Sequence, residues 1–87
     1  MIAMERIEYL RKKIDLIDKN IVRLLSLRFE LTKQIGNCKK KNKIKIIDRK
    51  RELQIIKNIK KYSTKTSQKF LQKIFGKIID YSRKIQK

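Results

Sequence analysis

The sequence predicts an all-α protein with three helices per chain and a long first helix, in which two chains form an intertwined homodimer helical bundle. Three observations predict this class. The 87 residues contain no proline, and both glycines lie inside helix-like stretches, so β-hairpin signals are missing. Apolar residues recur at helical spacing along most of the chain. The length fits one small domain, which we assign to residues 1–87.

The first helix is expected from about Glu5 to about Lys41. Its apolar residues recur at alternating steps of three and four, the spacing of a helix that packs along another helix. We call this row the seam. Its positions are Ile7, Leu10, Ile14, Ile17, Ile21, Leu24, Arg28, Leu31, Ile35 and Cys38.

One seam position holds an arginine, Arg28. A buried guanidinium is strongly destabilising unless it is paired and hydrogen-bonded. We therefore expect an anion to meet Arg28 inside the bundle, and this anion need not be part of the protein. The alternative is an ion pair that fixes helix register, with Glu30 or Glu52 of a neighbour.

Two shorter helices are expected after a lysine-rich connection, residues 40–47. Asp48 is a good N-cap for the second helix, which should reach about Tyr62. The polar residues 63–67 are expected to form a turn that offers caps to the third helix. The apolar residues expected to face inward are Ile55, Ile56 and Ile59 on the second helix and Leu71, Ile74, Phe75, Ile78, Ile79 and Ile85 on the third.

The length of the first helix indicates a dimer. A helix of about 36 residues is about 54 Å long at 1.5 Å per residue. A compact globule of this chain length has a radius of gyration of only about 12 Å. Two short helices cannot cover such a seam, so the first helix should lie along a second copy of itself, with two-fold symmetry.

Arg11 and Lys39 lie on the same edge of the seam, 28 residues apart. This separation is about 42 Å along a straight helix, so the two cannot share a site within one chain. If two first helices run antiparallel, Arg11 of one chain comes near the stretch between Arg28 and Lys39 of the other. Two equivalent cationic sites would result, each built from both chains.

Other polar side chains fall on inner faces of the shorter helices. Asp48 and Glu52 share a face with the isoleucines of the second helix, and Arg51 sits at its edge. On the third helix Ser82 takes a core-facing position, and Gln86 follows one turn later on the same side. With the cations of the first helix, this set would satisfy a small dianion that carries a hydroxyl group.

The net charge of +18 favours weak, salt-dependent attraction of nucleic acid. We interpret it mainly as compositional bias, since 19 of the 26 basic residues are lysines and 16 isoleucines accompany them. Lysine is a good helix former that keeps its charge in water. The scattered aromatic residues do not form stacking platforms. No specific nucleic-acid partner is therefore expected.

The sequence also bounds cofactors and location. It contains no histidine and one cysteine, so neither a metal site nor an internal disulfide is expected, and a reduced cytoplasmic setting fits best. The first ten residues carry charges and no apolar run, so neither a secretory signal nor a membrane span is expected.

At these residues the chain resembles the all-helical class of chorismate mutases. The resemblance rests on three stretches and their spacing, with Lys39 between the first two: LRKKIDLIDKNIVRLLSLR from residue 10, DRKRE from residue 48 and FGKIIDYSRKIQ from residue 75. It implies an isomerase that rearranges chorismate to prephenate in aromatic amino-acid (Phe/Tyr) biosynthesis, without a cofactor. Because the sequence ends at Lys87, we expect none of the fused dehydratase, dehydrogenase or synthase domains of some relatives.

The resemblance also implies roles for single residues. Arg28 of one chain and Arg11 of the partner chain would grip the two substrate carboxylates. Lys39 would contact a carboxylate and the ether oxygen, and Gln86 would donate to the same ether oxygen. The remaining substrate-binding residues would hold the ring hydroxyl (Glu52 with Asp48), support a carboxylate (Ser82) and line the pocket (Arg51).

The implied reaction needs no nucleophile, metal or proton transfer. The protein must hold the substrate in a chair-like conformation and stabilise charge on the ether oxygen. Two other classes stay open. A basic helical nucleic-acid-binding dimer would explain the charge but not Arg28 or the Asp48/Glu52 pair. A purely structural dimerisation module would explain the seam, and it predicts that Arg28→Leu stabilises the protein without loss of function.

Overall fold

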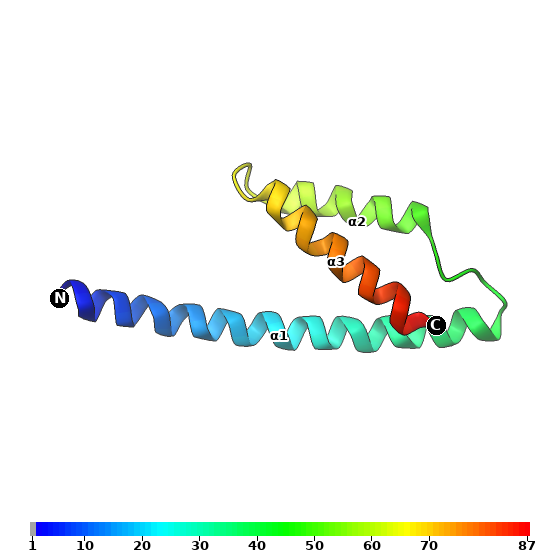
Figure 1. Ribbon diagram of the computed structural model, residues 1–87, viewed down its shortest axis with the longest axis horizontal. Coiled ribbons are helices and arrows are strands. Elements are labelled where there is room, and N and C mark those ends of the chain that lie inside the picture. The colour runs from blue at the N-terminus through cyan, green and yellow to red at the C-terminus, as the bar shows by residue number, and fades with distance from the viewer. Residues whose placement is uncertain (1) are drawn as a thin grey trace. The chain divides into compact units, whose positions relative to one another are not determined.

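The computed structural model describes residues 2–87 and contains three α-helices over that range (Figure 1): α1 Ala3–Lys41, α2 Arg49–Tyr62 and α3 Gln68–Gln86. No strand occurs between residues 2 and 87, so the all-α prediction is confirmed. The first helix begins two residues before the expected start and ends at Lys41 as predicted. Over the same residues no helix is long and apolar enough to cross a membrane.

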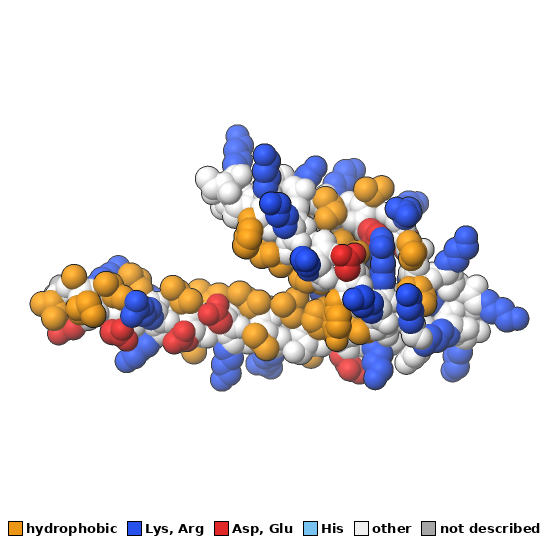
Figure 2. Space-filling model, viewed as in Figure 1, with side chains coloured by type: hydrophobic (Ala, Val, Ile, Leu, Met, Phe, Trp, Pro, Cys, Tyr) orange, Lys and Arg blue, Asp and Glu red, His pale blue; other side chains and the backbone are white. Residues whose placement is uncertain are grey.

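The chain divides into two compact units, Met1–Glu30 and Leu31–Lys87. The described part of the first unit is a single stretch of α1. A lone helix has no interior, so its apolar seam residues remain accessible, from 39% for Ile7 to 63% for Leu24. Figure 2 shows hydrophobic side chains in a row along this helix. The predicted apolar face therefore exists, and the first unit by itself does not bury it.

The second unit contains the last turns of α1, the connection that follows, α2 and α3. The two shorter helices pack against each other. Ile78 and Ile79 of α3 are the buried hydrophobic residues described, and the predicted isoleucines of α2 are half-buried. Ile74 is 37% exposed, so the expectation that it lies in the core is wrong for the single chain. Neighbouring helices cover only part of an apolar stripe, and Ile74 lies outside the covered part.

In the second unit, α1 uses a face beside the seam. Thr32 and Gly36 are buried, whereas the seam residues Leu31 and Ile35 are 60% and 52% exposed. Successive helical residues point about 100° apart, so the buried residues and the seam belong to adjacent strips of one helix. Packing within the chain thus leaves the seam open.

The two predicted caps differ in outcome. Asp48 is the N-cap of α2, and its Oδ1 accepts a hydrogen bond from the backbone N–H of Arg51 at 3.0 Å, which confirms the prediction. Ser67 precedes α3, but its side chain makes no capping bond, so that expectation is wrong. The Ser67 backbone is already helical, whereas a capping residue is normally extended. Its hydroxyl instead lies 2.7 Å from Thr64 Oγ1.

Candidate active site

The candidate site centres on a contact between α1 and α3 within the second unit. Lys39 Nζ donates to Gln86 Oε1 at 2.8 Å and to the backbone carbonyl of Ile46 at 2.7 Å. The amide of Gln86 is fixed from its other side, because Nε2 donates to the Ser82 carbonyl at 3.1 Å. Gln86 is buried and Lys39 is half-buried. Two polar groups 47 positions apart in the sequence are therefore held together away from bulk water.

This pair retains donors for a ligand. An ammonium group has three N–H donors and a primary amide has two. The bonds just described use two donors of Lys39 and one of Gln86. One N–H of each residue therefore remains for another acceptor.

Gly36 makes this contact possible. A Cβ at position 36 would lie 2.6 Å from Gln86 Cα and 2.9 Å from the Gln86 carbonyl oxygen, far inside van der Waals contact. The absence of a side chain lets α1 and α3 approach closely, one turn before Lys39. By its sequence context alone, Gly36 is only a residue inside a helix. Its position three residues before Lys39 is the signal that could have indicated a close helix contact.

The predicted residues at the start of α2 take separate positions. The Asp48 carboxylate serves as the helix cap described above. Arg51 is exposed, and its Nη1 donates to Gln54 Oε1 at 3.0 Å on the same helix. Glu52 is half-buried and accepts hydrogen bonds from Arg83 of α3.

The Glu52–Arg83 pair was not predicted from the sequence. Arg83 Nε donates to Glu52 Oε2 at 2.8 Å, and Arg83 Nη2 donates to Glu52 Oε1, so both carboxylate oxygens are engaged. The side chain of Arg83 is 32% exposed and that of Glu52 is 21% exposed. Hydrogen bonding from Arg83 holds the pKa of Glu52 below its ordinary value and raises the pKa of Arg83. Glu52 is therefore an ionised acceptor at neutral pH.

Ser82 lies on the inner face of α3, as predicted. It is 7% exposed, and its hydroxyl donates to the Ile78 carbonyl at 2.7 Å, one turn earlier in the same helix. This local bond is a common way to satisfy a buried serine in a helix. The burial of Ser82 and Gln86 confirms that both side chains face inward.

Two predicted arginines lie in the first unit. Arg11 Nη1 pairs with Glu8 Oε1 at 3.2 Å, and the side chains are 66% and 60% exposed. Such an exposed pair contributes little to stability. Arg28 is half-buried, in contrast to its seam neighbours Leu24 and Leu31, which are more than half exposed.

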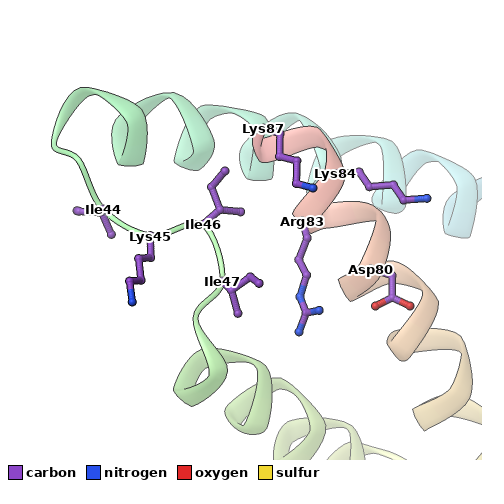
Figure 3. A pocket seen from close by; sticks show the side chains of 8 residues that line it. All are labelled: Ile44, Lys45, Ile46, Ile47, Asp80, Arg83, Lys84 and Lys87. Carbon is purple, nitrogen blue, oxygen red and sulfur yellow. The ribbon is translucent and has the colours of Figure 1, made fainter.

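A groove of about 740 Å³ lies beside the candidate site (Figure 3). Figure 3 shows the connection after α1 on one side of it and the last turns of α3 on the other. None of the predicted site residues lines this groove. Its lining residues are Ile44, Lys45, Ile46, Ile47, Asp80, Arg83, Lys84 and Lys87. Between residues 2 and 87 no cluster of acidic, cysteine and histidine side chains could hold a metal ion.

Comparison with protein families agrees with the helical pattern. The family model described as chorismate mutase type II matches residues 10–87 of this sequence. The chain belongs to the chorismate mutase type II family. The match begins within α1, covers α2 and α3 completely, and includes every predicted site residue, from Arg11 to Gln86.

Similar proteins include one named chorismate mutase and two named as bifunctional enzymes. The chorismate mutase of Methanocaldococcus jannaschii is 33% identical over 86 residues, covering 97% of this chain and 87% of that protein. The bifunctional chorismate mutase/prephenate dehydratase of Aquifex aeolicus is 45% identical over 56 residues. A second bifunctional relative, from Buchnera aphidicola, is 32% identical over 79 residues. The matches span only 16% and 21% of these two longer proteins.

One solved structure shares the fold. A conserved hypothetical protein from Pyrococcus furiosus superposes with a TM-score of 0.79 at 34% sequence identity. The alignment covers 94% of this chain and 96% of that one. The fold of this chain is therefore also that of a solved structure.

Proposed function

We propose that this protein is a chorismate mutase, which rearranges chorismate to prephenate at two sites in a homodimer. The observation that carries the proposal is the Lys39–Gln86 pair, which leaves one N–H of each group for a common acceptor. In the rearrangement an ether C–O bond breaks while a C–C bond forms within the same molecule, and negative charge develops on the ether oxygen. Two fixed donors aimed at that oxygen would stabilise the transition state more than the substrate.

The homodimer is part of the proposal. The exposed seam supports it, because burying a leucine or isoleucine side chain contributes roughly 1.5–3 kcal/mol and every seam position except Arg28 is apolar. A second α1 packed along the seam would bury these side chains on both chains at once. The half-buried Arg28 of each chain would then lie at this interface.

We carry over the remaining substrate contacts from the resemblance to chorismate mutases. Arg28 and the partner chain's Arg11 would bind the two carboxylates, since guanidinium groups bind carboxylates bidentately. Glu52, near the Asp48 turn, would accept a hydrogen bond from the ring hydroxyl. Ser82 would support a carboxylate after its hydroxyl turns away from the Ile78 carbonyl, and Arg51 would line the pocket. A reduced, cytoplasmic setting belongs to the same proposal.

Nucleic-acid binding is the second candidate, favoured only by the net charge of +18. The family match favours the mutase instead. A disappearance assay for chorismate on the purified protein, with prephenate identified as product, decides between them. Turnover supports the mutase. Inactivity together with tight, salt-sensitive DNA binding would support the alternative.

A complementation experiment tests the shared site. Arg11→Ala and Lys39→Ala homodimers should each be nearly inactive. Unfolding and refolding an equal mixture should give about half mixed dimers, in which one site has both residues and the other has neither. About a quarter of all sites would then be intact, and activity should recover towards that fraction. Mixed dimers that stay as inactive as their parents would show that the site is not shared.

A further inference from the structure

Arg83 joins the candidate site to the neighbouring groove. It comes from the last turns of α3, one residue after the inward-facing Ser82. Its guanidinium binds both oxygens of Glu52 on α2, and it also lines the groove between residues 44–47 and α3 (Figure 3). No other side chain described here bonds to the Glu52 carboxylate. The orientation of Glu52 therefore depends on one contact from another helix.

We propose that Arg83 is a positioning residue for Glu52: its two-pronged contact fixes the plane of the carboxylate so that the remaining lone pairs face the substrate hydroxyl. This inference rests on the proposed function, because in that function Glu52 accepts a hydrogen bond from the substrate hydroxyl. It extends that function to a residue outside the set expected to touch the substrate.

The geometry explains why an arginine is suited to this position. A guanidinium presents its N–H donors in a rigid planar fork, which matches the two oxygens of a carboxylate. Each carboxylate oxygen has two acceptor directions, and Arg83 occupies one on each. One direction on each oxygen is left for a ligand. A lysine could supply the charge but could not define the plane.

The charges around Glu52 also favour this role. Arg83 is the main cause of its lowered pKa, Arg49 on α2 adds to the effect, and Asp48 opposes it. Asp80, also on α3, raises the pKa of Arg83, as Glu52 does. Lys45 lines the groove beside Arg83. Removing the Arg83 charge should therefore let the pKa of Glu52 rise, because burial opposes ionisation.

The test compares Arg83→Gln with Lys84→Gln. Lys84 lines the same groove and carries the same charge, but it makes no bond to Glu52. We expect kcat/KM for chorismate to fall about 10- to 100-fold in Arg83→Gln, the usual effect of removing the partner that orients a ligand-binding group. Lys84→Gln should stay within about two-fold of the unmodified protein. Equal effects of the two substitutions would overturn the proposal.

Two further measurements test whether Arg83 acts through Glu52. In a Glu52→Gln background, Arg83→Gln should cause little additional loss, whereas an undiminished loss would overturn the proposal. The acidic limb of the kcat/KM profile should move to higher pH in Arg83→Gln, following the pKa of Glu52. An unmoved limb would show that Arg83 acts elsewhere.

Arg83→Lys covers the case in which the glutamine variant does not fold. It keeps the charge and an ion pair with Glu52, so circular dichroism should show an intact helical protein. Its kcat/KM should still fall several-fold, because the fork is lost. Wild-type activity in Arg83→Lys would overturn the positioning role. If the unmodified protein itself fails to convert chorismate, the proposed function fails, which is a separate outcome.

Discussion

Each of the two units carries an apolar stripe that is more stable out of water, and the units differ in how much of it they bury. The second unit, residues 31–87, brings three helical segments together, buries Ile78 and Ile79, and satisfies its inward polar groups by hydrogen bonds. The described part of the first unit is one stretch of helix, and its apolar row remains largely exposed. Both carry an apolar stripe in their sequence, but only one of them finds partners for it within its own unit.

The difference indicates a division of roles. The polar contacts that resemble a reaction site, Lys39 with Gln86 and Glu52 with Arg83, lie in the second unit. The first unit supplies most of the exposed seam. It also holds Arg11 and Arg28, which would bind the substrate carboxylates. We therefore expect substitutions at the polar contacts of the second unit to change catalysis first, and substitutions at the apolar seam positions of the first unit to change assembly first.

The largest effect should come from removing the donors of the second unit. Lys39→Ala and Gln86→Ala should each lower kcat by two orders of magnitude or more, because losing one preorganised donor costs about 3 kcal/mol of transition-state stabilisation. Helix content and oligomeric mass should not change, as measured by circular dichroism and light scattering. Near-normal turnover in both variants would contradict the assignment of the site.

A charge placed on the seam should weaken the proposed contact between the first helices of two chains. Ile17 is 57% exposed in the single chain and Leu53 of α2 is 71% exposed. Ile17→Asp should dissociate the proposed dimer, because it loses roughly 1.5–3 kcal/mol of apolar burial on each chain and buries a carboxylate. Leu53→Asp is the matched control and should leave the mass unchanged. Identical sedimentation of the two variants would refute the seam as the dimer contact.

The two glycines sharpen the comparison within the second unit. Gly36→Ala would force its Cβ against the Gln86 backbone, with an expected loss of about 1–3 kcal/mol in stability and reduced turnover as Lys39 and Gln86 separate. At Gly76 an added Cβ meets nothing within 4 Å. Gly76→Ala should stabilise α3 by up to about 1 kcal/mol through helix propensity. Urea denaturation measures both, and a neutral Gly36→Ala would contradict the close contact.

The smallest effect is a pH dependence of stability. The pKa of Glu52 is lowered in the folded chain from an ordinary value of 4.5, so its pairing with Arg83 stabilises the protein above that value. The contribution should disappear as pH falls through the lowered pKa. For a partly exposed pair it should amount to about 1 kcal/mol or less. Urea unfolding at pH 6 and pH 3.5 should show a smaller decrease for Arg83→Gln than for the unmodified protein, and equal decreases would contradict the assignment.

Local patterns in the sequence determined the helices and several orientations. The spacing of apolar residues is enough to predict α1, and Asp48 marks the start of α2, because helix periodicity and capping depend on residues only a few positions apart. The same reasoning placed Ser82 and Gln86 on an inner face. The seam likewise follows from periodicity alone, and its exposure is what a single chain of a dimeric bundle should show.

Only the tertiary structure decided which distant groups meet. The Lys39–Gln86 bond joins residues 47 positions apart, and the Glu52–Arg83 pair spans 31 positions. Neither distance has a periodic signature, because each depends on how closely two helices approach and in which register. Gly36 sets that approach between α1 and α3 through the side chain it lacks, and this effect becomes visible only when the facing backbone of Gln86 is in place.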